Sequence, residues 1–142
     1  MAVKTIYTAH ATVTGGREHG HGATDDGALD VQMRPPGSDE QGTNPEQLFA
    51  VGYAACFEGA LGVVGRRERV ELGEVSIESA VSLITTEERG FNVAVSLDVT
   101  LSGIDDSEQA KAIVAGAHQV CPYSNATRGN VEVTLTANGA AV

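Results

Sequence analysis

Two thiols, Cys56 and Cys121, are the most reactive side chains that the sequence offers. Cys56 lies in an apolar stretch, and a lone cysteine in such surroundings is most often an inert core residue with a raised pKa. A reactive thiol requires a nearby positive charge, because the ordinary pKa of about 8.5 leaves only a few per cent as thiolate at neutral pH. Spacing alone does not say which arginine would reach Cys56.

Cys121 directly precedes Pro122, at the predicted end of a helix, where thiols are more often accessible. If its sulfur meets that of Cys56, the pair is either a redox couple or a structural disulfide, and the second is unusual in a cytoplasmic protein. A zinc site is a further alternative, because His118 lies three residues before Cys121, but no fourth ligand is evident. We therefore expect no bound metal.

The elements that must position these thiols begin with strands. Residues 3–13 alternate loosely between polar and apolar, residues 17–22 suit a short second strand, and apolar residues alternate again over 29–33. A glycine pair at 15–16 and the turn sequence at 25–27 separate the three segments. The pattern predicts an N-terminal antiparallel meander.

The four residues 43–46 start a helix in one of two ways. Thr43 and Glu46 fit a capping box, or Asn44 caps a helix whose first residue is Pro45. The residues that follow are apolar nearly all round, up to a run of four charged residues. Such a helix is buried on most sides, so we expect a second subunit or a surrounding sheet to cover it.

The second half of the chain predicts a hairpin, a helix and a last strand. Strands over 75–83 and 91–101 flank a turn at 87–90, and the second strand alternates cleanly, as a strand with one solvated face does. Capping residues at 105–107 begin a helix that ends by Cys121, and a polar loop precedes a strand over 131–135. The order indicates an α+β fold in a single domain, residues 1–142.

Composition excludes several classes of partner. The chain of 142 residues has nine basic and nineteen acidic side chains, a formal charge of −10, so nucleic acid and anionic membrane surfaces are poor partners. The longest apolar stretch is shorter than the roughly 20 residues of a membrane helix. No apolar run follows a basic start, so we expect no signal peptide and a cytoplasmic location.

Four segments of the sequence are distinctive: GTNPEQLFAVGYAACF at 42–57, HQVCPYSNATRGN at 118–130, GGRE at 15–18 and DDGALDV at 25–31. Together they resemble the OsmC/Ohr family, in its organic hydroperoxide resistance (Ohr) branch. The resemblance implies an OsmC/Ohr-like α+β fold, with antiparallel sheets packed around central buried helices. It also implies an intertwined homodimer with two active sites at the subunit interface.

The resemblance further implies a thiol peroxidase that reduces organic hydroperoxides, including those of fatty acids, to alcohols. By position, Cys56 corresponds to the peroxidatic thiol, Cys121 to the resolving thiol, and Arg17 and Glu46 to their polar partners. Cys56 would become a sulfenic acid and then a disulfide with Cys121. No bound cofactor is implied, and the expected reductant is a dithiol, namely the dihydrolipoyl group of a lipoylated protein.

Residue spacing does not assemble this site by itself. Glu46 and Cys56 are ten residues apart on one predicted helix, about 15 Å along its axis, so they share a site only if the helix breaks or a partner subunit intervenes.

The aromatic residues Phe49, Tyr53 and Phe57 either line a channel for the alkyl group of the substrate or are ordinary core.

The alternative to a thiol peroxidase is a redox-sensing or lipid-binding dimer without efficient turnover.

Overall fold

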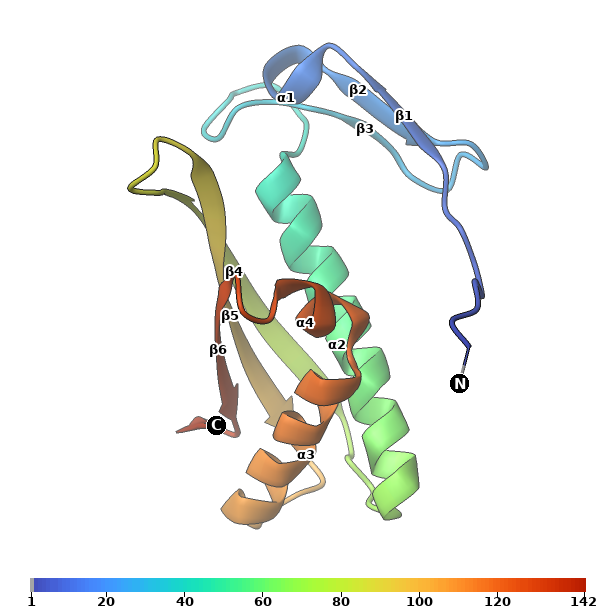
Figure 1. Ribbon diagram of the computed structural model, residues 1–142, viewed down its shortest axis with the longest axis vertical. Helices are drawn as coiled ribbons and strands as arrows, with labels where there is room; N and C mark the ends of the chain where they lie inside the picture. Colours follow the sequence, from blue (N-terminus) through green and yellow to red (C-terminus); the bar gives the residue numbers. More distant parts are fainter. Residues whose placement is uncertain (1) are drawn as a thin grey trace. The chain divides into compact units, whose positions relative to one another are not determined.

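Within residues 2–142, which the computed structural model describes, the chain forms four helices and seven strands in two sheets (Figure 1). These elements fall into two units: the first ends at Leu48, and the second is Phe49–Val142. The mixed α+β class is confirmed, and the expectation of a single domain stays a prediction.

The first unit is built on a small antiparallel sheet in the order β1-β2-β3, so the predicted meander is confirmed. Its elements are β1 (Ala11–Thr14), α1 (Gly16–His19), β2 (His21–Thr24) and β3 (Asp30–Gln32). Two details of the prediction are wrong. The first strand begins only at Ala11, and the first part of the segment 17–22 is a helical turn, because Gly15 and Gly16 have φ of 80° and 73° and redirect the chain.

The long helix α2 (Pro45–Glu68) begins at the second of the two predicted caps. The Asn44 side chain accepts a hydrogen bond of 2.9 Å from the Gln47 N–H, and Pro45 occupies the first helical position. The Thr43 hydroxyl bonds to the Gln47 side chain, so the capping box does not form. Glu46 is therefore available for another partner.

Only one side of α2 is buried within the chain. Tyr53, Phe57 and Leu61 have no exposed surface, whereas Val51 is 72% exposed and Ala55 is exposed as well. The expected burial on most sides is therefore not provided by the described residues of the second unit. By length and composition α2 is long enough to cross a membrane, unlike the shorter apolar stretch considered above, but a core helix passes the same test.

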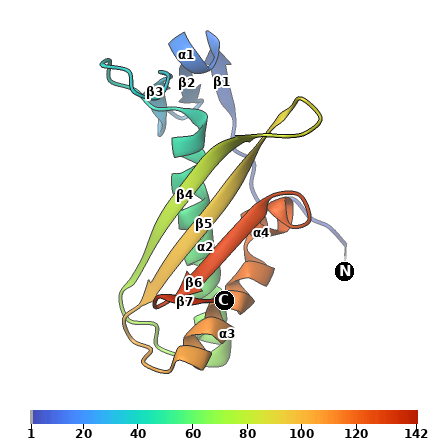
Figure 2. The same ribbon diagram turned by 90° about the vertical axis from the view of Figure 1, so that its left-hand side faces the viewer.

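The second unit places its helices against one face of a four-stranded sheet (Figures 1 and 2). The predicted hairpin is confirmed, and the sheet order is β4-β5-β6-β7. The strands are β4 (Val75–Thr85), β5 (Phe91–Leu101), β6 (Glu132–Ala137) and β7 (Ala140–Ala141), and the helices after β5 are α3 (Ser107–Val120) and α4 (Pro122–Thr127).

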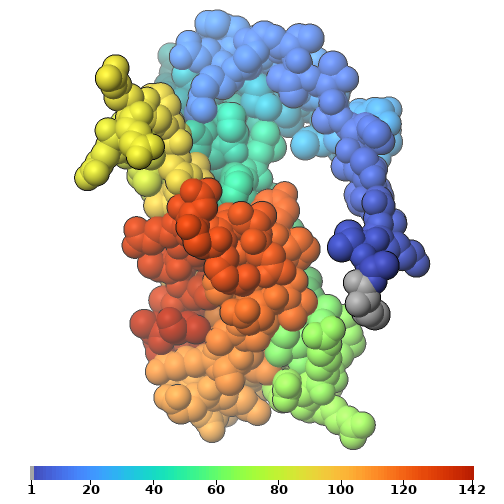
Figure 3. Space-filling view, viewed as in Figure 1, coloured from blue at the N-terminus to red at the C-terminus, as the bar shows by residue number. Residues whose placement is uncertain are grey.

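Two features of this unit depart from the prediction. The pair β5–β6 is parallel rather than antiparallel, because the chain crosses back over α3 and α4 between them. The predicted polar loop after Cys121 begins with the helix α4, for which Pro122 is a favourable first residue. In the space-filling view α3 and α4, in orange tones, form one continuous surface beside β6 (Figure 3).

The core of the second unit joins α2, α3 and the inner face of β5. Leu97, Val99 and Leu101 alternate with more exposed residues along β5, as the predicted solvated face requires. They pack with the buried residues of α2 and with Ile113 and Val114 of α3. Each fully buried aliphatic side chain contributes about 1.5–3 kcal/mol, so this core fixes the helices that carry the two cysteines.

We expect Asp106→Ala to lower the free energy of unfolding by about 1 kcal/mol. The Asp106 carboxylate accepts hydrogen bonds from the N–H groups of Glu108 and Gln109 at the start of α3, and alanine leaves both donors without that acceptor. Urea denaturation measures the change. Asp105→Ala is the matched control, since Asp105 is exposed and does not cap the helix; an equal loss in both variants would contradict the capping role.

Candidate active site

The sulfur atoms of Cys56 and Cys121 lie 3.6 Å apart, with the Cys121 thiol donating toward Cys56. Both are free thiols; Cys121 is completely buried and Cys56 is half-buried. A disulfide has an S–S distance of about 2.05 Å, so the two sulfurs are in contact and an approach of about 1.5 Å would join them. The structure therefore brings together the two thiols that the sequence places 65 residues apart.

The two cysteines differ in backbone conformation. Cys56 lies within the continuous helix α2, and Cys121 is the residue between α3 and α4, with extended φ and ψ of −62° and 124°. Its N–H still bonds to the Ala117 carbonyl, so it closes α3 before α4 begins. Pro122 enforces this break, because a residue before proline disfavours helical geometry.

Glycines let the helices come close enough for the thiols to meet. A Cβ on Gly52 of α2 would lie 3.1 Å from the Tyr123 hydroxyl oxygen, and one on Gly116 of α3 would lie 3.2 Å from Val64 Cγ1 of α2. Both distances are tighter than ordinary carbon contacts. The two glycines thus allow α2 to approach both α3 and α4.

Burial raises the pKa of the Cys56 thiol, and the neighbouring Cys121 adds to that effect. A hydrogen bond from the Tyr123 backbone N–H acts in the opposite direction and stabilises the thiolate. None of the causes of the shift is an arginine or a lysine of the described residues. The expected guanidinium that lowers this pKa is therefore not supplied by the described residues of the second unit.

The candidate arginine and glutamate form an ion pair within the first unit. One terminal nitrogen of Arg17, Nη2, donates to both Glu46 carboxylate oxygens, at 2.6 and 2.8 Å. Glu46 lies in the first turn of α2, where the helix dipole favours a negative charge. The Arg17 side chain is 46% exposed, so the pair orients the guanidinium without enclosing it.

The tight turn around α1 positions Arg17. Gly15, with its positive φ, precedes the helix, and Gly20 follows it. A Cβ on Gly20 would overlap the Gly16 carbonyl oxygen, so no larger residue fits there without moving the backbone. These glycines explain why the GGRE segment forms a helical turn and presents the Arg17 side chain.

The three aromatic candidates differ in exposure. Tyr53 and Phe57 are completely buried core residues, whereas Phe49 is half-buried. The Phe49 ring meets those of Tyr53 and Tyr123 edge-on, at centroid distances of 6.0 and 5.8 Å. Tyr123 is 39% exposed and was missed by the sequence analysis, although its position two residues after Cys121 could have indicated it. A channel lined by Phe49, Tyr53 and Phe57 stays a prediction.

A buried polar cluster beside the thiols was also missed. The Ser124 hydroxyl lies 2.7 Å from the Tyr53 hydroxyl and 2.8 Å from His118 Nδ1. His118, considered above as a zinc ligand, uses that nitrogen for Ser124 in this structure. Among the described residues, no group of three His, Cys, Asp or Glu side chains could hold a metal ion.

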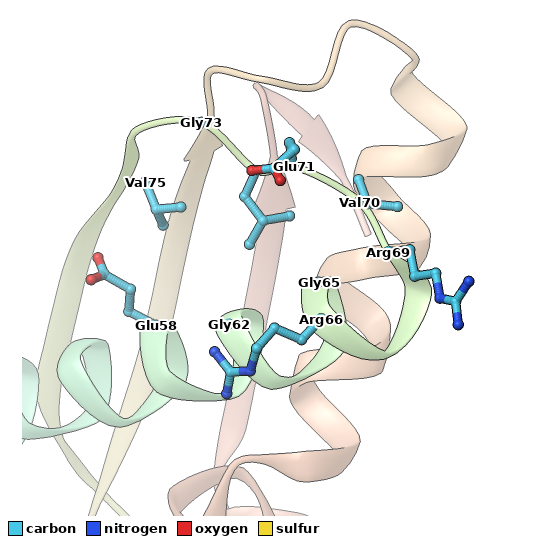
Figure 4. A pocket seen from close by; sticks show the side chains of 10 residues that line it. Glu58, Gly62, Gly65, Arg66, Arg69, Val70, Glu71, Gly73 and Val75 are labelled. Carbon is cyan, nitrogen blue, oxygen red and sulfur yellow. The ribbon is translucent and has the colours of Figure 1, made fainter.

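A wide groove of about 650 Å³ lies along the C-terminal part of α2 and the segment that follows it (Figure 4). Its charged side chains carry both signs, with Glu58 and Glu71 negative and Arg66 and Arg69 positive. Neither cysteine lines this groove, and its lining residues include no other nucleophile. The thiol pair, rather than this groove, is therefore the candidate active site.

Comparison with known proteins identifies the family. The model of the family described as OsmC-like protein matches residues 37–136. The chain is 52% identical over 138 residues to an organic hydroperoxide resistance protein from Xanthomonas axonopodis pv. citri (strain 306), covering 94% of this chain and 95% of that protein. The chain belongs to the OsmC/Ohr family. The resemblance of the four sequence segments is thus confirmed.

Crystal structures of other OsmC/Ohr family members agree with the fold. The organic hydroperoxide resistance protein OhrB of Bacillus subtilis is 46% identical, with a TM-score of 0.87, covering 93% of this chain and 98% of that one. An organic hydroperoxide resistance protein from Elizabethkingia anophelis is 44% identical, also with a TM-score of 0.87, covering 94% and 97%. The expected OsmC/Ohr-like fold is therefore confirmed.

Proposed function

We propose that this protein is a thiol-dependent peroxidase that reduces organic hydroperoxides to alcohols. The names of its relatives in the OsmC/Ohr family support a role in the detoxification of organic hydroperoxides. The observation that carries the proposal is the contact between Cys56 and Cys121, at 3.6 Å. A pair of free thiols at this distance can pass through a sulfenic acid to a disulfide.

In the first step the Cys56 thiolate attacks the terminal oxygen of the hydroperoxide. The S–O bond forms as the O–O bond breaks, Cys56 becomes a sulfenic acid, and the leaving alkoxide takes up a proton to give the alcohol. The Tyr123 N–H stabilises the thiolate before the attack. Arg17 lowers the pKa of Cys56 and stabilises the charge that develops on the leaving oxygen, and Glu46 holds the guanidinium in place.

In the second step Cys121 attacks the sulfenic sulfur of Cys56 and releases water, forming the disulfide. The 3.6 Å contact between the two sulfur atoms supports this step, because the attack would need no large movement of the helices. A dithiol then reduces the disulfide by exchange and is itself oxidised to a disulfide. We propose the dihydrolipoyl group of a lipoylated protein as that dithiol, as the family resemblance implies.

We propose that Arg17 reaches Cys56 across the interface of an intertwined homodimer with two active sites. Helix α2 is continuous from Pro45 to Glu68, so a break in the helix does not bring Glu46 to Cys56. Val51, Ala55 and Gly59 are exposed at intervals of four residues, and small residues at this spacing allow a second helix to pack closely. A second subunit would cover this face and supply the missing cation.

The substrate would enter between aromatic side chains. Phe49 and Tyr123 keep exposed surface, so they are the better placed of the aromatic residues to contact an alkyl group. Tyr53 and Phe57 support them from the core. Apolar contacts of this kind would favour alkyl and fatty-acid hydroperoxides over hydrogen peroxide.

The mass of the fully reduced protein should change on reaction with an organic hydroperoxide. One equivalent of cumene hydroperoxide should remove two hydrogens per chain and link Cys56 to Cys121, faster than hydrogen peroxide does, as measured by intact mass spectrometry and peptide mapping. Cys56→Ser should abolish the reaction. Cys121→Ser should consume one peroxide per Cys56 to give the sulfenic acid, and should accumulate the sulfinic acid when a second equivalent is added.

An unchanged mass in the wild type would overturn the peroxidase proposal. Formation of the disulfide without repeated turnover in the presence of excess dihydrolipoamide would instead favour a redox-sensing dimer.

Arg17→Ala should move the pH dependence of hydroperoxide reduction to higher pH. Loss of the cation removes an interaction that favours the thiolate, so the pKa of Cys56 rises and the rate at pH 7 falls at least about tenfold. Stopped-flow rates from pH 5 to about pH 10 locate the midpoint. Arg34→Ala is the matched control, because Arg34 is also paired with a glutamate in the first unit. A midpoint shared by Arg17→Ala and the wild type would refute the role of Arg17.

A mixing experiment tests the site across the interface. Arg17→Ala and Cys56→Ser chains, unfolded together and refolded as a 1:1 mixture, should recover about a quarter of the wild-type sites, because each mixed dimer contains one complete site. Each variant refolded alone is the control. If the mixture is no more active than the two separate samples added together, each site is built from a single chain.

A further inference from the structure

We infer that Ser124, together with Tyr53 and His118, positions Cys121 for attack on the sulfenic acid of Cys56, so that the disulfide forms before a second peroxide molecule reacts. This inference rests on the proposed peroxidase function and assigns positioning residues for its second step. It concerns residues of the second unit only.

The three side chains form one connected hydrogen-bond cluster. Ser124 Oγ lies 2.7 Å from Tyr53 Oη and 2.8 Å from His118 Nδ1, and Tyr53 Oη lies 3.4 Å from Thr127 Oγ1. Tyr53 and Ser124 are completely buried. Buried polar groups of this kind fix the groups that they join, because each would lose its partner if the elements separated.

The cluster ties together the segments that carry the thiols. Tyr53 lies three residues before Cys56 on α2, His118 three residues before Cys121 on α3, and Ser124 three residues after Cys121 on α4. Ser124 of α4 is thus hydrogen-bonded to a side chain of α2 and to a side chain of α3. Because Cys121 is the extended residue between α3 and α4, the angle at which these helices meet sets the place of its sulfur.

A second contact reinforces the same junction. The Arg128 guanidinium, just after α4, donates to the His118 backbone carbonyl at 2.5 Å and to the Asn125 side chain at 2.7 Å. Burial and the positive charge of Arg128 also hold the pKa of His118 below its ordinary value, which keeps the imidazole neutral. A neutral imidazole has one nitrogen that can accept a hydrogen bond from the Ser124 hydroxyl.

The position of Cys121 matters because two reactions compete for the sulfenic acid. Attack by Cys121 forms the disulfide and releases water, whereas a second hydroperoxide molecule oxidises the sulfenic acid to a sulfinic acid and leaves as the alcohol. The first reaction is intramolecular, so its rate depends on how often the Cys121 sulfur is correctly oriented. Loosening the junction should therefore shift the products toward the sulfinic acid.

The test measures this product ratio in Ser124→Ala. Reduced protein is treated with excess cumene hydroperoxide in the absence of reductant, and intact mass separates the disulfide, which lacks two hydrogens, from the sulfinic acid, which has gained two oxygens. We expect the ratio of sulfinic acid to disulfide to rise roughly three- to tenfold. Both products arise from the same sulfenic acid, so the ratio does not depend on the rate of the first step.

Two further variants make the test specific. Tyr53→Phe removes the hydroxyl but keeps the ring, and should raise the ratio in the same direction even if Ser124→Ala folds poorly. Combining both substitutions should give no larger effect than the stronger single one, because either breaks the same cluster. Ser102→Ala is the matched control: its hydroxyl accepts a 2.7 Å hydrogen bond from the Glu74 N–H, away from the thiols.

The outcomes separate the two proposals. A ratio equal to that of the wild type in folded Ser124→Ala and Tyr53→Phe, or an equal rise in Ser102→Ala, would overturn the positioning role while leaving the peroxidase function intact. A wild-type protein that does not react with the hydroperoxide would overturn both.

Discussion

The approach of two sulfur atoms from distant parts of the chain is the constraint on which the second unit depends. A 3.6 Å contact between Cys56 and Cys121 requires α2 to lie close to both α3 and α4. Gly52 and Gly116 permit that approach, and the apolar core between the helices and β5 maintains it. The break at Pro122 then turns the Cys121 sulfur out of the line of α3.

This arrangement creates an electrostatic problem that the second unit does not solve. Burial protects the thiol pair but raises the pKa of Cys56, and among the described residues the Tyr123 N–H is the group that opposes that effect. In the proposed peroxidase a cation lowers this pKa, and we propose Arg17 for that role: the Glu46 carboxylate anchors a single guanidinium nitrogen and leaves the Arg17 side chain half exposed. An interface between subunits would satisfy both this need and the uncovered face of α2.

Local signals predicted most of the fold. The alternation along β5, the capping residues Asn44 and Asp106, and the stop before Pro122 each depend on neighbours in sequence, and each is found in the structure. The errors arose where distant contacts or the backbone angles of glycine determine the secondary structure. The helical turn α1 follows from positive φ at Gly15 and Gly16, and the parallel β5–β6 pair follows from a crossover that no local pattern reveals.

The candidate site also has a part that the sequence predicts and a part that it does not. Cys56 and Cys121 could be identified from the sequence, through their chemistry and through the family resemblance, but their contact could not, since 65 residues separate them. Ser124 shows why the rest was missed: a serine in a polar segment reads as a loop residue until the structure buries it between Tyr53 and His118. Its position three residues after Cys121 becomes informative only in the structure, where α2, α3 and α4 meet at Ser124. A buried hydroxyl with two such partners restricts the motion of all three, and the rate of an intramolecular reaction depends on that restriction.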